Sequence, residues 1–182
     1  MINPTSAKDR QRGFSLAEVL VAVALMAVIL LALFGLVSAG VRRAYSGKKM
    51  TEASILAQHV LERANVYGPQ DILGGVATSA TVSRPWVKSG PADSDTTPAA
   101  TGGATTFEIE RDEIRKLLVN SDIPANSTYP ARLTVTATAV GAAGVTFNTA
   151  SMVRIVVDVS WFEWGTRQKR VRLQALNLRT TP

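Results

Sequence analysis

The chain has 182 residues, enough for one globular domain and an appendage, and a formal net charge of +6 at pH 7. The basic excess is mild and much of it lies in flanking segments and one strand, so charge alone does not indicate a nucleic-acid-binding protein. The sequence contains no cysteine, which excludes a disulfide framework, a thiolate metal site and a cysteine nucleophile.

Residues 14–39 form the first predicted element, a long apolar helix. Glu18 is the only residue in this stretch that can carry charge. At a rise of about 1.5 Å per residue the helix is about 39 Å long, which exceeds the roughly 30 Å hydrocarbon core of a bilayer. The segment is therefore predicted to span a membrane.

Glu18 is costly in that setting, since an ionised carboxylate at mid-bilayer is unfavourable by about 2.5–3.5 kcal/mol on insertion scales. An intramembrane carboxylate is by default a functional residue with a cationic partner. No Lys, Arg or His lies between Phe14 and Gly40. One partner that fits is an α-amino group, which becomes available if the chain is cut just before Phe14.

The residues around this position resemble a known processing site. The run Gly13-Phe14-Ser15-Leu16-Ala17-Glu18-Val19-Leu20 is similar to the cleavage site of type IV prepilins and of type II secretion pseudopilins. In that family a short basic leader ends in glycine, a phenylalanine becomes the mature N-terminus, and a glutamate occupies the fifth mature position. The leader, residues 1–13, carries three basic side chains and one acidic side chain.

The resemblance implies that a prepilin peptidase cleaves the Gly13–Phe14 bond and N-methylates Phe14. Glu18 then pairs with the Phe14 amine of a neighbouring subunit and sets the axial register of a helical fibre, while Leu16, Leu20 and Val23 pack in its core. The implied partners are the peptidase, other pilins or pseudopilins, an inner-membrane assembly platform, and membrane lipid before assembly.

The same resemblance implies a single-pass protein of the bacterial inner (cytoplasmic) membrane, with a cytoplasmic N-terminus and a periplasmic or extracellular head, later built into a pilus or pseudopilus. Two other interpretations of the segment compete. One is an ordinary signal anchor, in which Glu18 is accidental. The other is a secretory signal cut after Val37-Ser38-Ala39, but such signals have an apolar core of about 7–15 residues and this segment is much longer.

Residues 40–67 are predicted to continue the helix in amphipathic form, and Gly68-Pro69 to end it. Residues 68–182 are predicted to form a globular β-rich head, with a flexible loop at about 88–105 where Gly, Ser, Thr, Pro, Ala and Asp dominate. The residues expected on the apolar helix face are Ala53, Leu56, Ala57, Val60, Leu61 and Ala64.

Four segments alternate as strands do: Thr106–Arg111, Arg132–Val140, Met152–Phe162 and Lys169–Leu178. The last two read as a hairpin joined at Trp164-Gly165-Thr166. The predicted fold class is therefore α+β and pilin-like, a long N-terminal helix packed on a small antiparallel sheet. The inward side chains predicted for the last three strands are Leu133, Val135, Ala137, Ala139, Val153, Ile155, Val157, Val159, Trp161, Val171, Leu173 and Ala175.

No residue pattern points to catalysis. His59 is read as a surface residue, since metal binding would need further ligands. The acidic side chains Glu108, Glu110, Asp112 and Glu113, mixed with basic ones, indicate a solvated junction between a strand and a helix, with a calcium site as the alternative. Because no nucleophile–base pair, phosphate loop or metal spacing occurs, the chain is predicted not to be an enzyme and to need no cofactor or metal.

Arg167, Lys169, Arg170 and Arg172 make a basic stripe near the end of the chain. One interpretation is the solvated face of an edge strand, where charge blocks aggregation. The alternative is a DNA- or partner-contacting patch, as in competence pilins, with Trp164 as an exposed contact residue.

The predicted function is that of a minor pilin or minor pseudopilin, a tip or initiation component of a type IV pilus or type II secretion pseudopilus. It would support protein secretion, or adhesion, motility or DNA uptake. A finer resemblance, carried by residues 57–63 and by Val159-Ser160-Trp161, is to minor pseudopilin I and the PilV-like minor pilins. The alternative is a bitopic, membrane-anchored binding module that is not built into a fibre.

Overall fold

A computed structural model describes the chain outside residues 1–14, 75–78, 91–105, 148, 165–166 and 179–182. Its elements, in chain order, are α1 (Leu16–Tyr67), α2 (Pro69–Leu73), β1 (Thr81–Lys88), α3 (Thr106–Asn120), β2 (Ala131–Val140), β3 (Met152–Glu163) and β4 (Arg167–Leu178). The chain divides into two compact units, Met1–Ala44 and Tyr45–Pro182, which are described in turn. The second unit is called the head.

Helix α1 confirms the predicted long helix and its end point. It stops at Tyr67, and Gly68 follows with φ 85°, a left-handed conformation that glycine adopts without steric cost. Pro69 then begins the short helix α2. Gly35, Gly40 and Gly47 all lie within continuous α1, and a Cβ added at any of them would meet no atom within 4 Å.

The described part of the first unit is the apolar beginning of α1. Its large side chains are exposed, from Leu16 at 79% to Val37 at 63%. The helix is long and apolar enough to cross a membrane, and none of its most apolar window is buried within the protein. A core helix of a soluble protein would bury such side chains, so the candidate membrane span predicted from the sequence is supported by its exposure.

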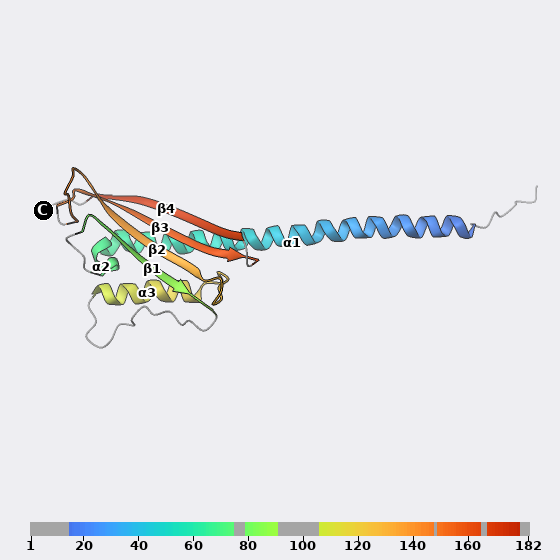
Figure 1. Ribbon diagram of the computed structural model, residues 1–182, viewed down its shortest axis with the longest axis horizontal. Coiled ribbons are helices and arrows are strands. Elements are labelled where there is room, and N and C mark those ends of the chain that lie inside the picture. Colours follow the sequence, from blue (N-terminus) through green and yellow to red (C-terminus); the bar gives the residue numbers. More distant parts are fainter. Residues whose placement is uncertain (1–14, 75–78, 91–105, 148, 165–166, 179–182) are drawn as a thin grey trace, which may run out of the picture. The chain divides into compact units, whose positions relative to one another are not determined.

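The head is built on a four-stranded antiparallel sheet in the order β1-β2-β3-β4 (Figure 1). Each strand pairs with the next along the chain, and the register is continuous: Leu133 of β2 lies opposite Trp86 of β1 and Val159 of β3. Because side chains alternate along a strand, each row of partners faces one side of the sheet. The predicted hairpin is confirmed by the pairing of β3 with β4.

One face of the sheet, here called the inward face, packs against the helices of the head. The buried cluster joins this face to Ala53, Leu56, Ala57, Val60 and Ala64 of α1 and to Ile114 and Leu118 of α3. The inward side chains predicted for β2 and β3 are buried or packed on this cluster, and Trp161 is 1% exposed. The α+β pilin-like fold is thereby confirmed.

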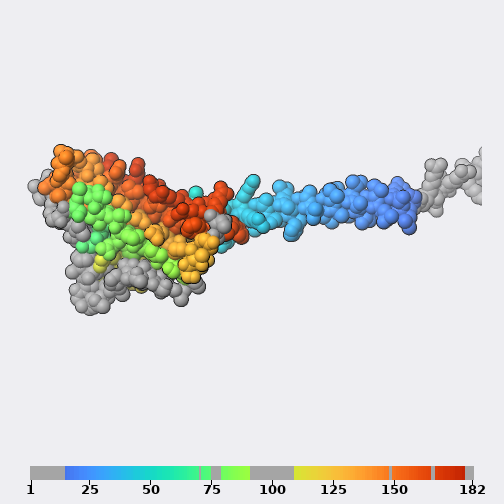
Figure 2. Space-filling view, viewed as in Figure 1, coloured from blue at the N-terminus to red at the C-terminus, as the bar shows by residue number. Residues whose placement is uncertain are grey.

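The opposite, outward face of the sheet is turned to solvent. Its strands form one continuous surface of the head, seen from the same side in Figure 2. Along β4 the side chains alternate between exposed and half-buried, as predicted, with Arg170, Arg172 and Gln174 exposed.

The structure corrects two predictions in the middle of the chain. Thr106–Arg111 is not a strand but the start of α3, which runs to Asn120. The short alternation of Phe107 and Ile109 is overridden by the spacing of Ile114 and Leu118, which are four apart and completely buried. The packing of Ile114 and Leu118 in the core therefore determines that this segment is a helix and not a strand.

The second correction is β1, Thr81–Lys88, which was not predicted. The polar composition of this segment and its Pro85 do not suggest a strand from the sequence. Proline is nevertheless tolerated in an edge strand, and β1 is an edge strand of the sheet. The flexible loop predicted at about 88–105 therefore cannot begin at Lys88, which ends this strand and is 7% exposed. Most of that predicted loop, residues 91–105, lies outside the described residues.

Candidate assembly site and contact surfaces

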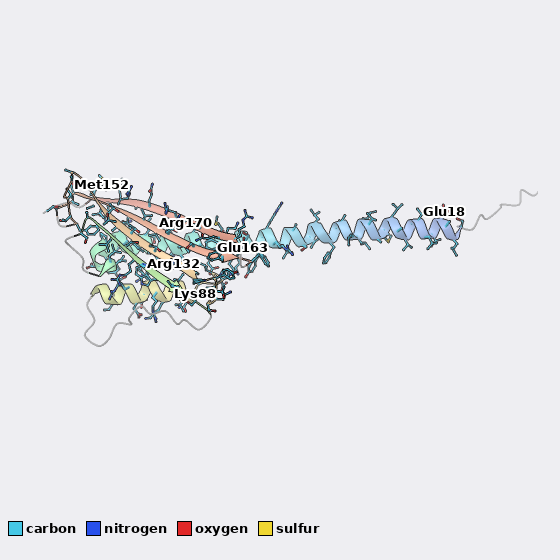
Figure 3. All side chains as sticks on the ribbon, viewed as in Figure 1. Glu18, Lys88, Arg132, Met152, Glu163 and Arg170 are labelled. Atoms are coloured by element: carbon cyan, nitrogen blue, oxygen red, sulfur yellow. The ribbon has the colours of Figure 1, made fainter. Side chains whose placement is uncertain are left out.

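Glu18 lies in the first turn of α1 and is exposed (labelled in Figure 3). Ser15 precedes the helix, and its hydroxyl oxygen accepts a hydrogen bond from the Glu18 backbone N–H at 3.2 Å. A serine followed three residues later by glutamate is a capping-box pattern, which satisfies backbone donors at a helix start. An acidic side chain in the first turn also complements the helix dipole. Sequence reasoning missed this local role, although the Ser15–Glu18 spacing signals it.

The helix surface around Glu18 is apolar and open. Leu16, Leu20 and Val23 are 79%, 62% and 61% exposed. Within the described residues the Glu18 carboxylate makes no ion pair. A hollow of about 310 Å³ beside it is lined by Glu18, Val19, Ala22, Val23 and Met26. The predicted cleavage residues Gly13 and Phe14 lie outside the described part of the chain.

A comparison with protein families matches residues 8–40 to the prokaryotic N-terminal methylation motif. The N-terminal segment is that of a type IV pilin-like protein. The family with this motif is structural rather than catalytic, and the motif implies processing by prepilin peptidase and assembly with other pilins. It also fits anchoring in the inner membrane through the apolar helix. No curated protein and no solved structure matches the chain.

On the outward face of the pilin-like head, Asp158 of β3 holds two arginines of β4. Arg170 Nε donates to the two carboxylate oxygens at 2.7 and 2.6 Å, and Arg172 Nε donates to Oδ2 at 3.0 Å. Burial by itself raises the pKa of Asp158, but the hydrogen bonds and charges of the two arginines outweigh it and hold this pKa below its usual value. Hydrogen bonding to the same carboxylate raises the pKa of Arg170.

The predicted basic stripe is divided between the two faces of β4. Arg170 and Arg172 face outward, whereas Lys169 lies opposite Trp161 on the inward side, with its Nζ 3.6 Å from Glu163. Arg167 is exposed at the start of the strand. Trp164, at φ 58°, is 67% exposed beside the turn. The edge position of β4 agrees with the solvated-strand interpretation of this stripe.

A groove of about 410 Å³ runs over the outward face beside Asp158. Figure 3 labels two of its arginines, Arg132 on β2 and Arg170 on β4. Sequence reasoning did not select Arg132, because its neighbours in the groove come from other strands. The lining residues are Arg132, Thr134, Thr136, Val156, Asp158, Ser160, Gln168, Arg170 and Arg172.

Two buried lysines hold the carboxyl end of α3. Lys49 of α1 is 4% exposed, and its Nζ donates to the Asp122 carbonyl oxygen at 2.6 Å. Lys88 of β1 is 7% exposed and donates to the Ser121 carbonyl oxygen at 2.5 Å. These two carbonyls belong to the residues that directly follow α3, so the ammonium groups satisfy backbone acceptors just past the helix and lie near its partly negative end.

Three members of the predicted acidic cluster, Glu110, Asp112 and Glu113, make ion pairs on α3 rather than at a junction between a strand and a helix. Glu110 is 5% exposed and bonds Arg63 of α1 at 2.8 Å. Asp112 and Glu113 lie 3.1 and 3.0 Å from Lys116 Nζ. Among the described residues no group of three or more His, Asp or Glu is placed to hold a metal ion. His59 is exposed on α1, as predicted.

Proposed function

We propose that the chain is a minor pilin or minor pseudopilin, made as a membrane-held precursor and then built into or onto the fibre of a type IV pilus or type II secretion machine. The observation that carries this proposal is the methylation motif at residues 8–40, continued by an apolar helix whose side chains the protein itself leaves exposed. In a fibre subunit one such apolar helix serves two stages, because it lies in lipid before assembly and packs against the helices of neighbouring subunits afterwards.

In the proposed pathway, prepilin peptidase cuts between Gly13 and Phe14 and N-methylates Phe14. Residues 14–39 then leave the membrane for the fibre core, where Leu16, Leu20 and Val23 pack against neighbouring helices. Glu18 pairs with the Phe14 amine of the next subunit. Neither charge is stable alone in an apolar core, so burying them together favours one axial register.

The proposed roles follow from this topology. Residues 1–13 remain cytoplasmic until removal, residues 40–67 continue the helix into the head, and residues 68–182, the β-rich part of the head, form the outside of the fibre. As a tip or initiation subunit the chain would support protein secretion, or adhesion, motility or DNA uptake. Its partners would be the other subunits and the inner-membrane assembly platform, with no catalytic step and no cofactor.

Intact-mass and N-terminal analysis of the chain purified from its host tests the proposal. In cells with active prepilin peptidase we expect a protein that begins at Phe14 and carries one added methyl group. Gly13→Leu should leave the chain beginning at Met1, because a bulky side chain replaces the residue before the cut. Gly35→Leu is the matched control, since a side chain there has open space around it and should leave cleavage unchanged.

A wild-type protein that still begins at Met1 in those cells would contradict the proposal and favour the membrane-anchored binding module. Cross-linking in the host followed by mass spectrometry then separates the two machines. Recovery of secretion pseudopilins would assign the chain to a secretion pseudopilus. Recovery of pilus subunits would assign it to a pilus, where adhesion, motility and DNA uptake become the activities to measure.

A further inference from the structure

The outward face of the sheet carries two rows of polar side chains in register. Arg132, Ser160 and Arg170 are direct partners across β2, β3 and β4, and Thr134, Asp158 and Arg172 form the next row. Neighbouring strands lie about 4.8 Å apart, so the backbones at Arg132 and Arg170 are about 10 Å apart with Ser160 between them. All six residues line the groove of about 410 Å³.

The charge of this groove is unbalanced in favour of cations. Arg132, Arg170 and Arg172 face it against the single carboxylate of Asp158. Asp158 orders Arg170 through Nε and the terminal nitrogen Nη2, and Arg172 through Nε, while the side chains of Arg170 and Arg172 remain 54% and 55% exposed. Within the described residues Arg132 makes no ion pair. The guanidinium forks therefore keep donors for further acceptors, and such forks match carboxylates in geometry.

Toward the other end of β4 the same face also exposes apolar side chains, with Arg154 directly opposite Leu176. Leu176 and Leu178 are 61% and 70% exposed, and Val140 is 39% exposed. Leu178 lies directly opposite Met152. A second hollow, of about 510 Å³, is lined by Val140, Met152, Arg154, Gln174, Ala175 and Leu176. Exposed apolar side chains that gather beside polar ones are typical of protein-binding surfaces.

We propose that the outward face docks a segment of a partner protein that places carboxylates over Arg132 and Arg170 and apolar side chains over Leu176 and Leu178. Charge complementarity selects the acidic half of the segment, and the exposed leucines at the second hollow, which Arg154 and Gln174 also line, select its apolar half. A nucleic acid fits less well, because its backbone gains nothing from the leucines. The lining of the groove also contains no aromatic ring on which bases would stack.

This inference is separate from the proposed function, since a head that is never built into a fibre would present the same face. Processing at Gly13 and binding at Arg132 are measured in different experiments. A failure of one therefore leaves the other standing.

The test uses the full chain in nanodiscs of zwitterionic phosphatidylcholine and labelled probes followed by fluorescence anisotropy. The main probe is a short peptide with alternating glutamates in one half and alternating leucines in the other. A second peptide has glutamine at each glutamate position, and a third probe is single-stranded oligothymidylate of similar length. We expect the glutamate peptide to bind at least about tenfold more tightly than the glutamine peptide, and its affinity to fall with added salt.

Arg132→Gln should weaken the glutamate peptide about tenfold, because a charge-assisted hydrogen bond is lost from the groove. Arg167→Gln is the matched control, since it removes the same charge from an exposed arginine that does not line the groove. Unfolding curves of both variants confirm that the head remains folded.

Three results would overturn the proposal. Equal weakening by the Arg132 and Arg167 variants would mean unspecific attraction. Tighter binding of the oligonucleotide with the same dependence on Arg132 would assign the groove to nucleic acid. No binding of either probe would mean that the face is not a docking surface.

Discussion

Asp158 stands between two arginines whose charges it neutralises only in part. Its side chain is 12% exposed, whereas those of Arg170 and Arg172 are more than half exposed. A largely buried carboxylate thus holds two guanidinium groups that remain open to solvent. Its protonation state sets both the net charge of the groove and the positions of these two groups.

Acid should therefore weaken the head through Asp158. Because the pKa of Asp158 is lower in the folded than in the unfolded chain, its ionised form stabilises the fold above the unfolded pKa of about 3.9, and this contribution disappears as the pH falls through the lower folded value. Asp158→Asn should lower the free energy of unfolding at neutral pH by about 1 kcal/mol. The difference from wild type should close in strong acid.

Urea unfolding of the full chain in detergent measures this effect, with the buried Trp86 and Trp161 as fluorescent reporters of the head. Glu113→Gln is the control, because Glu113 is 40% exposed and bonds only the surface residue Lys116 among the described contacts. A stability difference for Asp158→Asn that stays constant from neutral to acid pH would show that the charge is not the cause.

At the scale of elements, the carboxyl end of α3 is where three parts of the head meet. Lys49 comes from α1, Lys88 from β1, and the Asp122 backbone N–H donates to Glu52 Oε1 of α1 at 2.5 Å. Neighbouring Lys48 also reaches Asp122, at 3.5 Å, but from an exposed position. Two adjacent lysines thus reach the same residue, Lys49 through a buried hydrogen bond to the carbonyl oxygen and Lys48 through an exposed ion pair with the carboxylate, which makes them a matched pair.

Lys49→Met should lower the free energy of unfolding of the head by about 1–3 kcal/mol. The methionine keeps an apolar stem of similar length but leaves the Asp122 carbonyl without its buried donor. Lys48→Met should change the stability by less than about 1 kcal/mol, since it removes only an exposed ion pair. Equal effects in denaturant unfolding would show that the buried hydrogen bond does not hold α3 in place.

The sequence analysis succeeded where the determining interactions are local. Period-two alternation located β2, β3 and β4 and their inward side chains, and Gly68-Pro69 located the end of α1. The processing motif was recognisable because its residues are contiguous. In each case the information lies within a few residues along the chain.

The sequence analysis failed where residues far apart in the chain determine the secondary structure or the composition of a site. Thr106–Arg111 alternates locally, but burial of Ile114 and Leu118 against the core makes the segment helical. Lys49 lies one helical turn before Ala53 of the predicted apolar face and is stabilised there by a carbonyl 73 residues away. Arg132 becomes part of a groove only through the register of β2 with β3 and β4. None of these partners can be read from spacing in one segment.

At the scale of the whole molecule, the two units bury their apolar residues in different ways. All residues of the buried core cluster lie from Ala53 onward, so the head encloses its own core. The described part of the first unit contributes none of them and leaves its large apolar side chains exposed. The stability of that unit therefore depends on what surrounds it, which is lipid or neighbouring helices in the proposed pathway.

Glu18 is the one charged side chain near the start of that exposed helix, and two roles for it can be separated by substitution. The hydrogen bond from the residue-18 backbone N–H to Ser15 Oγ does not depend on the side chain at this position. In a capping box a Glu or Gln side chain three residues after the serine can also bond the serine N–H, so Glu18→Gln keeps that capacity and removes only the charge. Glu18→Ala removes the charge and the side-chain capping capacity. If the charge pairs with the Phe14 amine of a neighbour, both variants should be cleaved normally and incorporated into fibres at least about tenfold less than wild type. An uncompensated charge in an apolar setting costs about 2.5–3.5 kcal/mol, and about 1.4 kcal/mol corresponds to tenfold.

Quantifying each variant in sheared fibre fractions and in membranes, next to the wild-type chain, gives the incorporation ratio. Normal incorporation of Glu18→Gln with loss of Glu18→Ala would assign Glu18 to helix capping alone. Normal incorporation of both would show that the axial register comes from the apolar packing of residues such as Leu20 and Val23. Loss of both with intact cleavage leaves the charge as the common cause, because it is the only property that glutamine and alanine both lack at this position.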